Sequence, residues 1–528
     1  MTLLTDDALQ VDPPRTLRAR DNARTRSDTK TTRCLLIGVC VAIVVAIHVT
    51  DLFRPFPGDG AMFIVMGKIV SQGGGIGREI IDNKFPTVGL LTSGGWALAG
   101  ASWPIWEILL TAMGLAGPIL LARSAGRYLG EHTALPTLLF ALIYLNFSYG
   151  VDGFHLEAAQ VFFTAIAASA ALAALTVDDP RDSFLVGLSA GMAAMLKPSG
   201  LAVLAAFAAA NLLHYRRRPQ RIAAHAAAAL GGVLIPGIVT LIYLVAADLL
   251  REIPVISSQI ARYAAGSHWE SAGWIKWALV AMVIGFPLLV RGVVFRRERD
   301  RMPTRLNINV AVFALVWIVI EALGVAAQGR MYKYHFLALT PPAAVLFGML
   351  PRRDRAFPLI AALVLPLLLS AMGELLVTDR FVSPKSRLAA SEYLSAHATP
   401  GDRVWADTMT RLLIETDLQP GSSYFSTFLW ANDDDAPLKD CRAMLEQFEQ
   451  RKPRYILLPV DGDEYVRSYV DGVDELRQNQ RRAAGYRQAW SLLRSYVQEH
   501  YAPEARIENE IVYHRSDNPP AHEENQDN

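Results

Sequence analysis

Short motifs of carboxylates and cations, set among glycines and prolines, recur beside long apolar stretches of this chain. The first motif, 57–60, contains Asp59; the second, 82–86, contains Asp82 and Lys84; the third, 151–157, contains Asp152, His155 and Glu157. Carboxylates can act as general bases or hold a metal ion, whereas lysine, arginine and histidine can neutralise a phosphate. The combination therefore suits chemistry on a substrate with an anionic head group.

Later segments add to this set of ionisable residues. The pair Lys197-Pro198 separates two apolar runs, and the segment 329–335 is both basic and aromatic, with Arg330, Tyr332, Lys333 and His335. Three glutamates, at 107, 321 and 374, fall inside apolar runs. Ionisable groups within a membrane are costly and tend to mark functional sites, so these positions are candidates for the same site.

Several of these residues also have a purely structural interpretation, which the sequence alone leaves open. Asp59 could cap a helix over 60–70. Lys84 and Arg330 could be interface cations whose ammonium and guanidinium groups reach water, and the two histidines could be ordinary interface residues. Glu157 is harder to explain structurally, because an unpaired charge one turn into a membrane span is costly.

The elements that must position these residues are membrane spans. Hydrophobic residues make up 52% of the 528 positions and charged residues only 19%, where about a quarter is usual. A spanning helix needs about 20 mostly apolar residues, and we predict about eleven. They cover 34–50, 103–122, 134–149, 154–176, 184–196, 200–214, 222–247, 273–294, 308–327, 334–350 and 357–377. The segment 88–100 is less apolar and predicts an interfacial helix.

Basic residues cluster in alternate loops, which indicates the orientation of the spans because cytoplasmic loops carry the excess of lysine and arginine. The tail before the first span is strongly basic, and further clusters lie at 123–127, 181, 216–221, 296–305 and 352–355. The N-terminus is therefore predicted to be cytoplasmic. With an odd number of spans, the C-terminal part lies on the opposite side, where the candidate motifs also gather.

The sequence predicts a polytopic α-helical membrane protein with a C-terminal extracytoplasmic α/β domain. A turn and strand near 399–406, a helix over 438–450, a strand over 455–460, a helix over 482–501 and a strand over 507–513 support the α/β part. The predicted division is a cytoplasmic basic tail (1–33), a transmembrane part (34–378) with a first outer loop at 51–102, a soluble periplasmic domain (379–515) and a disordered tail (516–528).

Charge and cysteine content exclude some classes of function. A net charge of +1 provides no field that attracts nucleic acid, so a polynucleotide-binding protein is not expected. Cys34, Cys40 and Cys441 are too few for a disulfide framework. Asp433, Asp434 and Asp435 are interpreted as a solvated acidic loop rather than as metal ligands.

The order of these motifs resembles a known family. A first apolar span, an outer loop with Asp59 followed by Gly60, an Asp-x-Lys-x-Pro element at 82–86 and Glu157 early in the fourth span are similar to the polyprenyl-phosphate-dependent glycosyltransferases of the GT-C fold. The protein O-mannosyltransferases and the enzymes that add aminoarabinose or galacturonic acid to lipid A belong there. The resemblance covers nearly the whole chain, including the basic-aromatic segment and the C-terminal α/β part.

The resemblance implies a role for each matching residue. Asp59 is the expected base, Asp82 its companion, and Asp152 or Glu157 the carboxylate of the second outer loop. Lys84 is expected to meet the donor phosphate, with Arg330, Lys333 and His335 as looser matches, and His155, Lys197 and Tyr332 as secondary candidates. Some members have an acidic residue where this chain has Asn83, so the resemblance implies no metal ligand there. A divalent metal stays open as a cofactor, and no other cofactor is implied.

The implied reaction moves one sugar, with inversion, from a polyprenyl-phosphate donor to a hydroxyl of a glycolipid such as lipid A, a glycan or a protein, on the outer face of a bacterial inner membrane. The expected partners are membrane lipids, this donor and such an acceptor. Two rivals stay open at this point. An O-antigen ligase or polymerase would carry its arginine and histidine on a large outer loop between late spans, and a flippase or other transporter would bind its cargo near the midplane.

Overall fold

The computed structural model describes most of the chain in separate stretches. They are residues 58–82, 84–152, 156–265, 305–328, 333–349, 385–407, 410–427, 430, 435–472, 474–477 and 479–516, with single residues at 38, 41, 42, 45 and 49. Most of the predicted first span and all of the predicted spans at 273–294 and 357–377 lie outside the described residues, as do the two tails.

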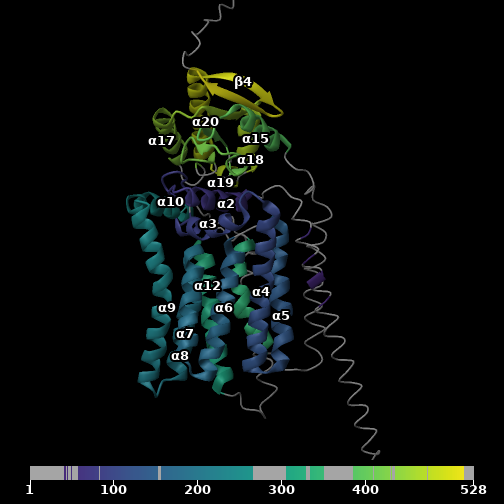
Figure 1. The fold of residues 1–528 in the computed structure, drawn as a ribbon, viewed down its shortest axis with the longest axis vertical. Coiled ribbons are helices and arrows are strands. Elements are labelled where there is room, and N and C mark those ends of the chain that lie inside the picture. Colours follow the sequence, from purple (N-terminus) through teal and green to yellow (C-terminus); the bar gives the residue numbers. More distant parts are fainter. Residues whose placement is uncertain are drawn as a thin grey trace, which may run out of the picture.

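A bundle of long, roughly parallel helices forms the body of the molecule (Figure 1). In chain order the helices are α4 (Trp103–Leu129), α5 (Glu131–Asp152), α6 (Leu156–Val177), α7 (Pro180–Leu196), α8 (Ala202–His214), α9 (Pro219–Ala246), α12 (Arg305–Gln328) and α13 (Thr340–Gly348), with 3₁₀ turns η1 (Pro198–Leu201) before α8 and η4 (Lys333–Leu339) before α13. Among the described residues, four helical stretches are long and apolar enough to cross a membrane: Trp103–Leu129, Leu156–Val177, Pro219–Ala246 and Ile308–Val325.

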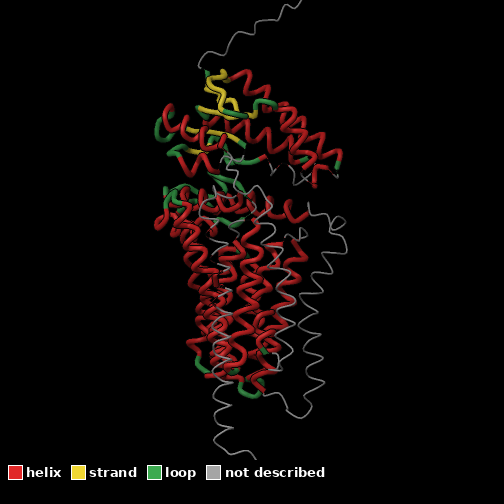
Figure 2. Tube along the Cα trace, turned by 90° about the vertical axis from the view of Figure 1, so that its right-hand side faces the viewer, coloured by secondary structure: helices red, strands yellow, loops and turns green. Residues whose placement is uncertain are grey.

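The described basic loops lie at the same end of the helical bundle, as their alternation along the chain predicts. The turn between α6 and α7 contacts the start of α9, where Asp178 bonds the ring of His225 (3.0 Å) and pairs with Arg221 (3.7 Å). The same histidine bonds the Ser183 hydroxyl through its other nitrogen (2.6 Å). The basic loops at 123–127, 181 and 216–221 thus gather at one end of the bundle, while the β-strands, all of which belong to residues 403–515, lie beyond the other end (yellow in Figure 2).

Helices α7 and α9 approach closely because small residues line their contact. A Cβ atom at Gly232 would overlap the carbonyl oxygen of Phe184, and one at Gly187 would overlap that of Ala229. The neighbouring Gly231 has open space around its Cβ position. Backbone therefore packs on backbone here, and only glycine fits at positions 187 and 232 without a shift of the helices.

We expect Gly232→Ala to destabilise the bundle and Gly231→Ala to leave it unchanged or slightly more stable. The first substitution forces a methyl group into the α7 backbone, and overpacking of this kind costs about 1–3 kcal/mol. The second adds a better helix former at an open position. Thermal unfolding of the two variants in one detergent gives the comparison, and equal midpoints would contradict the proposed close contact.

A layer of shorter helices covers the other end of the bundle, between it and the C-terminal residues (Figure 1). It contains α2 (Gly58–Ser71), α3 (Thr87–Ala99), the 3₁₀ turn η2 (Leu250–Glu252) and α10 (Ile253–Ala265). Helix α3 occupies the segment for which the sequence predicts an interfacial helix. The predicted first outer loop thus contains two helices, α2 and α3, joined by a segment that is not helical where the structure describes it.

The C-terminal unit is built on one mixed sheet. Its strands are β1 (Arg403–Ala406), β2 (Gln419–Pro420), β3 (Tyr455–Pro459), β4 (Tyr501–Ile507) and β5 (Glu510–Arg515), in the order β2-β1-β3-β5-β4. The first three strands of that order are parallel, and β5 and β4 are antiparallel additions. The helices are α15 (Lys385–His397), α16 (Thr410–Glu415), α17 (Ala436–Arg451), α18 (Gly462–Gly472), α19 (Asp474–Arg477) and α20 (Gln480–His500).

Aromatic residues form the core of this unit, and its last two strands differ from the sequence-based prediction. Large aromatic side chains, including Trp405, Trp490 and Tyr486, are fully buried around the sheet. The prediction of a single strand over 507–513 is wrong, because the chain turns at Glu508, which has a positive φ of 51°. Tyr501 and Ile507 therefore bound one strand of a hairpin and 510–515 forms the other. Asp435 is exposed and pairs with Arg481 (3.1 Å), and Asp433 and Asp434 lie outside the described residues.

Candidate active site

The described candidates all lie at the bundle end that faces the C-terminal unit. Asp59 is the second residue of α2, Asp152 the last residue of α5 and Lys333 the first of η4, and for these three the structure describes the backbone. Asp82 is buried ahead of α3 and Lys84 is half-buried. His155, Arg330 and Tyr332 lie outside the described residues.

Three predicted residues from different helices meet in one buried group. Lys197 donates a hydrogen bond from Nζ to Oε1 of Glu157 (2.6 Å), and Nε2 of His335 lies 3.9 Å from the same oxygen. The side chains of Glu157 and His335 are 7% and 4% exposed. Burial of a charged pair is costly unless each charge has close partners, and the short distance between Lys197 and Glu157 meets that condition.

The local sequence explains how these residues come to lie there. Glu157 stands in the first turn of α6, where a carboxylate is favoured by the positive end of the helix dipole. Lys197 follows the last residue of α7 in an extended conformation, directly before Pro198, which starts a new turn. The break between α7 and α8 therefore directs the lysine toward the start of α6.

Glu321, which the sequence singled out, and three polar residues that it did not extend this group along the bundle. Nε2 of Gln160 donates to Oγ of Ser199 (2.9 Å), and Nε1 of Trp317 donates to Oε1 of Glu321 (3.4 Å). Glu321 in turn lies close to Ser199 and Lys197. The spacing of Gln160, three residues after Glu157 on the same helix face, is the signal that could have predicted its place.

The second motif lies against the end of α7. The Thr87 hydroxyl, at the start of α3, donates to the carbonyl oxygen of Met195 (2.5 Å), two residues before Lys197. Ile81, directly before Asp82, donates its backbone N–H to the carbonyl oxygen of Ser423 in the C-terminal unit (2.8 Å). The segment that carries Asp82 and Lys84 thus lies between the helical bundle and the C-terminal unit.

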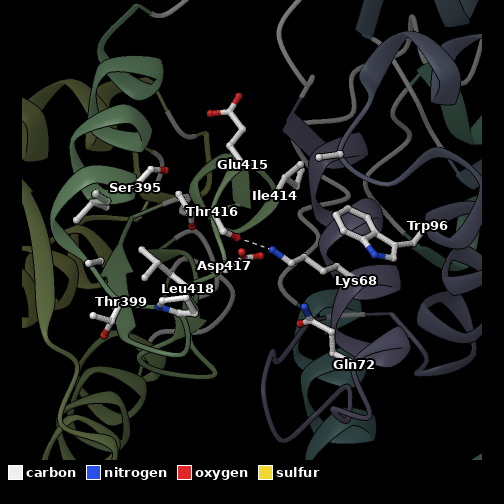
Figure 3. A pocket seen from close by; sticks show the side chains of 14 residues that line it. Lys68, Gln72, Trp96, Ser395, Thr399, Ile414, Glu415, Thr416, Asp417 and Leu418 are labelled. Atoms are coloured by element: carbon white, nitrogen blue, oxygen red, sulfur yellow. Dashed lines mark hydrogen bonds between the residues drawn. The ribbon is translucent and has the colours of Figure 1, made fainter.

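A lysine that the sequence left unassigned joins α2 to the C-terminal unit. Nζ of Lys68 donates to the carbonyl oxygens of Leu413 (2.6 Å) and Thr416 (2.5 Å), at the end of α16, and lies over the ring of Trp96 (Figure 3). Burial lowers the pKa of this ammonium below its ordinary value, an effect that the nearby Asp417 opposes. A cavity of about 370 Å³ opens beside it, between α2, α3 and the C-terminal unit.

No group of three or more histidine, cysteine, aspartate or glutamate side chains in the described part of the chain is arranged to hold a metal ion. What the arrangement offers chemically is a set of carboxylates and cations at one end of an apolar bundle. Carboxylates there can accept a proton, and cations can stabilise negative charge on a phosphate. Such a site suits a substrate that is partly lipid and partly polar.

Comparisons with known proteins agree with this chemical interpretation. Residues 83–243 match the family model described as dolichyl-phosphate-mannose-protein mannosyltransferase. No curated protein matches the sequence. Among solved structures, ArnT from Cupriavidus metallidurans, crystallised bound to undecaprenyl phosphate, is similar with 12% identity and a TM-score of 0.52, over 90% of this chain and 97% of that one. The chain therefore has a helical fold similar to that of ArnT, and its residues 83–243 resemble the dolichyl-phosphate-mannose-protein mannosyltransferases in sequence.

Proposed function

We propose that this chain is an integral membrane glycosyltransferase that moves a single sugar from a polyprenyl-phosphate donor to an acceptor hydroxyl. The observation that carries the proposal is the coincidence of two independent features. The fold is similar to that of ArnT, whose structure contains undecaprenyl phosphate, and the described candidate residues of this chain lie at the same end of the apolar bundle, where Glu157, Lys197 and His335 meet.

The reaction requires a base and a stabilised leaving group. The acceptor oxygen attacks the anomeric carbon from the side opposite the phosphate, which inverts that carbon. Asp59 takes the proton of the hydroxyl, the bond from the anomeric carbon to the phosphate oxygen breaks, and this oxygen keeps the electron pair. Lys84 and Arg330 stabilise the charge on the departing polyprenyl phosphate, and Asp82 assists Asp59 in placing the acceptor.

The buried group around Glu157 adds further charged residues to this proposed site. Glu157 provides the carboxylate of the second outer loop and holds Lys197 by a short hydrogen bond (2.6 Å). Nε2 of His335 lies 3.9 Å from the same carboxylate oxygen, and Lys333, two residues before it, adds a further cation for the phosphate. In the orientation that the basic loops favour, this end of the bundle faces the periplasm and the N-terminus lies in the cytoplasm.

The proposal predicts consumption of the donor by the purified protein. Proteoliposomes are supplied with undecaprenyl-phosphate sugars, one sugar at a time, together with a membrane lipid extract as the source of acceptors. We expect one donor to yield free undecaprenyl phosphate and a glycosylated lipid, both detected by mass spectrometry. A protein that only moved the intact donor between leaflets would be a transporter and would overturn the proposal.

The same experiment can be read in cells. Mass spectrometry of the glycolipids from a deletion strain, compared with a strain that carries the gene again, identifies the missing sugar and its acceptor together. Loss of a single-sugar modification fits a transferase of this kind, whereas loss of a whole polymer would indicate a ligase or polymerase.

A further inference from the structure

The segment 76–82 is held tightly between the helical bundle and the C-terminal unit. Ile76, Ile80 and Ile81 are buried, and the backbone N–H of Ile81 donates to the carbonyl oxygen of Ser423 (2.8 Å). The next residue is Asp82. The position of this short segment therefore determines where the side chain of Asp82 and, two residues later, that of Lys84 leave the backbone.

Helix α17 of the C-terminal unit holds this segment through two of its residues, Gln447 indirectly and Arg451 directly. Oε1 of Gln447 accepts hydrogen bonds from the backbone N–H of Ser423 (2.7 Å) and from its hydroxyl (3.0 Å), and so fixes the residue that bonds Ile81. One turn later, Nη2 of Arg451 donates to the carbonyl oxygen of Arg78 (2.6 Å). Residues four apart face the same way on a helix, so a single face of α17 holds both ends of the 78–81 stretch.

Glu79 is the charged centre of this contact. Its Oε2 accepts from Nη1 of Arg451 (3.4 Å) and lies 3.6 Å from Nη1 of Arg403, the first residue of β1. Arg403 is itself held in place, because the same nitrogen donates to the carbonyl oxygen of Pro420 in the neighbouring strand β2 (2.7 Å). The Glu79 side chain is only 19% exposed, so these guanidinium groups act on it with less screening than at an open surface.

We propose that Glu79 is a positioning residue, through which the C-terminal unit fixes the chain that carries Asp82 and Lys84. This role rests on the proposed function, since it gives the C-terminal unit a task in the same site. Arg451 and Arg403 hold the Glu79 carboxylate, Ser423 holds the Ile81 amide, and the two anchors together set the direction in which the chain enters Asp82. Catalytic groups need such support, because a small misplacement costs a large part of the rate.

A second contact joins the C-terminal unit to α2, the helix that contains Asp59. Lys68 binds the carbonyl oxygens at the end of α16 and stands on α2, the helix whose first turn contains Asp59. The C-terminal unit therefore contacts both elements that bring candidate carboxylates of the first outer loop to the site.

The structure contains a matched control for this proposal. Nη1 of Arg262, on α10, lies 3.2 and 3.3 Å from the two carboxylate oxygens of Asp440, on α17. This ion pair joins the same helix of the C-terminal unit to the same helical layer, but at α10 and not at the segment that leads to Asp82. A general loosening of the C-terminal unit would follow from breaking either pair, whereas a positioning effect would follow only from breaking the Glu79 contacts.

The test compares Glu79→Gln and Arg451→Gln with Asp440→Asn in the full-length protein, in the donor-consumption assay and by hydrogen exchange. We expect a fall in kcat of about 10- to 100-fold for the first two and partial recovery in Glu79→Asp, which keeps the charge. Amide exchange should rise in peptides covering 76–85 for the first two variants only. Thermal unfolding should be similar in the Glu79→Gln and Asp440→Asn proteins.

Two outcomes would overturn the proposal. One is an unchanged kcat and unchanged exchange at 76–85 in both Glu79→Gln and Arg451→Gln. The other is an equal loss of activity in Asp440→Asn, which would indicate a general effect on folding. If the wild-type protein consumed no donor, the proposed function would fail, while the exchange measurement would still decide whether Glu79 holds the segment in place.

Discussion

Purified Asp59→Asn protein is expected to bind the donor normally and to transfer sugar about 10²- to 10⁴-fold more slowly than the wild type, which is the usual contribution of a general base. The amide has nearly the shape of the carboxylate but cannot take the proton of the acceptor hydroxyl. Asp59 is the second residue of α2 and not the residue that precedes the helix, so the substitution leaves the N-cap position unchanged. Single-turnover rates with saturating donor measure the chemical step.

The matched control for this variant is Asp471→Asn, which removes an exposed carboxylate on α18 of the C-terminal unit. It should transfer sugar at the wild-type rate. Asp59→Asn protein that kept the wild-type rate would remove Asp59 from the role of base. Loss of stability without loss of rate would then indicate a purely structural role at the start of α2, where the helix dipole favours a carboxylate.

The second large effect concerns the buried pair of Glu157 and Lys197. Lys197→Met should destabilise the protein by about 3–5 kcal/mol, because it leaves the Glu157 carboxylate buried without its closest cation (2.6 Å in the wild type). The double variant Glu157→Gln/Lys197→Met should recover most of this stability, since no buried charge is left unpaired. Thermal unfolding in detergent measures the difference, with ligand-free protein throughout.

Activity separates the structural and chemical roles of this pair. If Glu157 and Lys197 act on the substrate, the double variant will unfold close to the wild-type temperature and yet remain inactive. Arg481→Met is the control, because its pair with Asp435 is open to solvent on both sides and such pairs contribute little. Equal unfolding midpoints for Lys197→Met and the wild type would contradict the importance of the contact.

The membrane part was predictable because its signals are local. Apolar runs of span length and clusters of arginine in alternate loops need no knowledge of distant contacts. The short pair of helices that meets at Lys197 and the interfacial helix before Trp103 were found in this way and appear as α7, α8 and α3. The hairpin at Glu508 was missed because its turn contains neither glycine nor proline.

The site was predictable only in part. Its residues could be assigned to one end of the bundle, but the pairing of Glu157 with Lys197 joins positions 40 residues apart, and the bonds of Lys68 and Arg451 cross 345 to 373 residues. No local pattern indicates which of many outer cations meets which carboxylate or carbonyl. Lys68 and Glu79 were unremarkable in sequence because their partners belong to the C-terminal unit.

The contacts by which α17 holds the segment 76–82 have a consequence for the biosynthesis of the protein. Arg451 follows Arg78 by 373 residues, which at about 5–20 residues per second of translation is a delay of roughly 20–75 s. The membrane helices can insert during that time, but the segment before Asp82 still lacks the residues that hold it. With Glu79 in the proposed role, a nascent or prematurely terminated chain would be a membrane protein without transferase activity, and turnover would begin only when the last part of the chain has been made and folded.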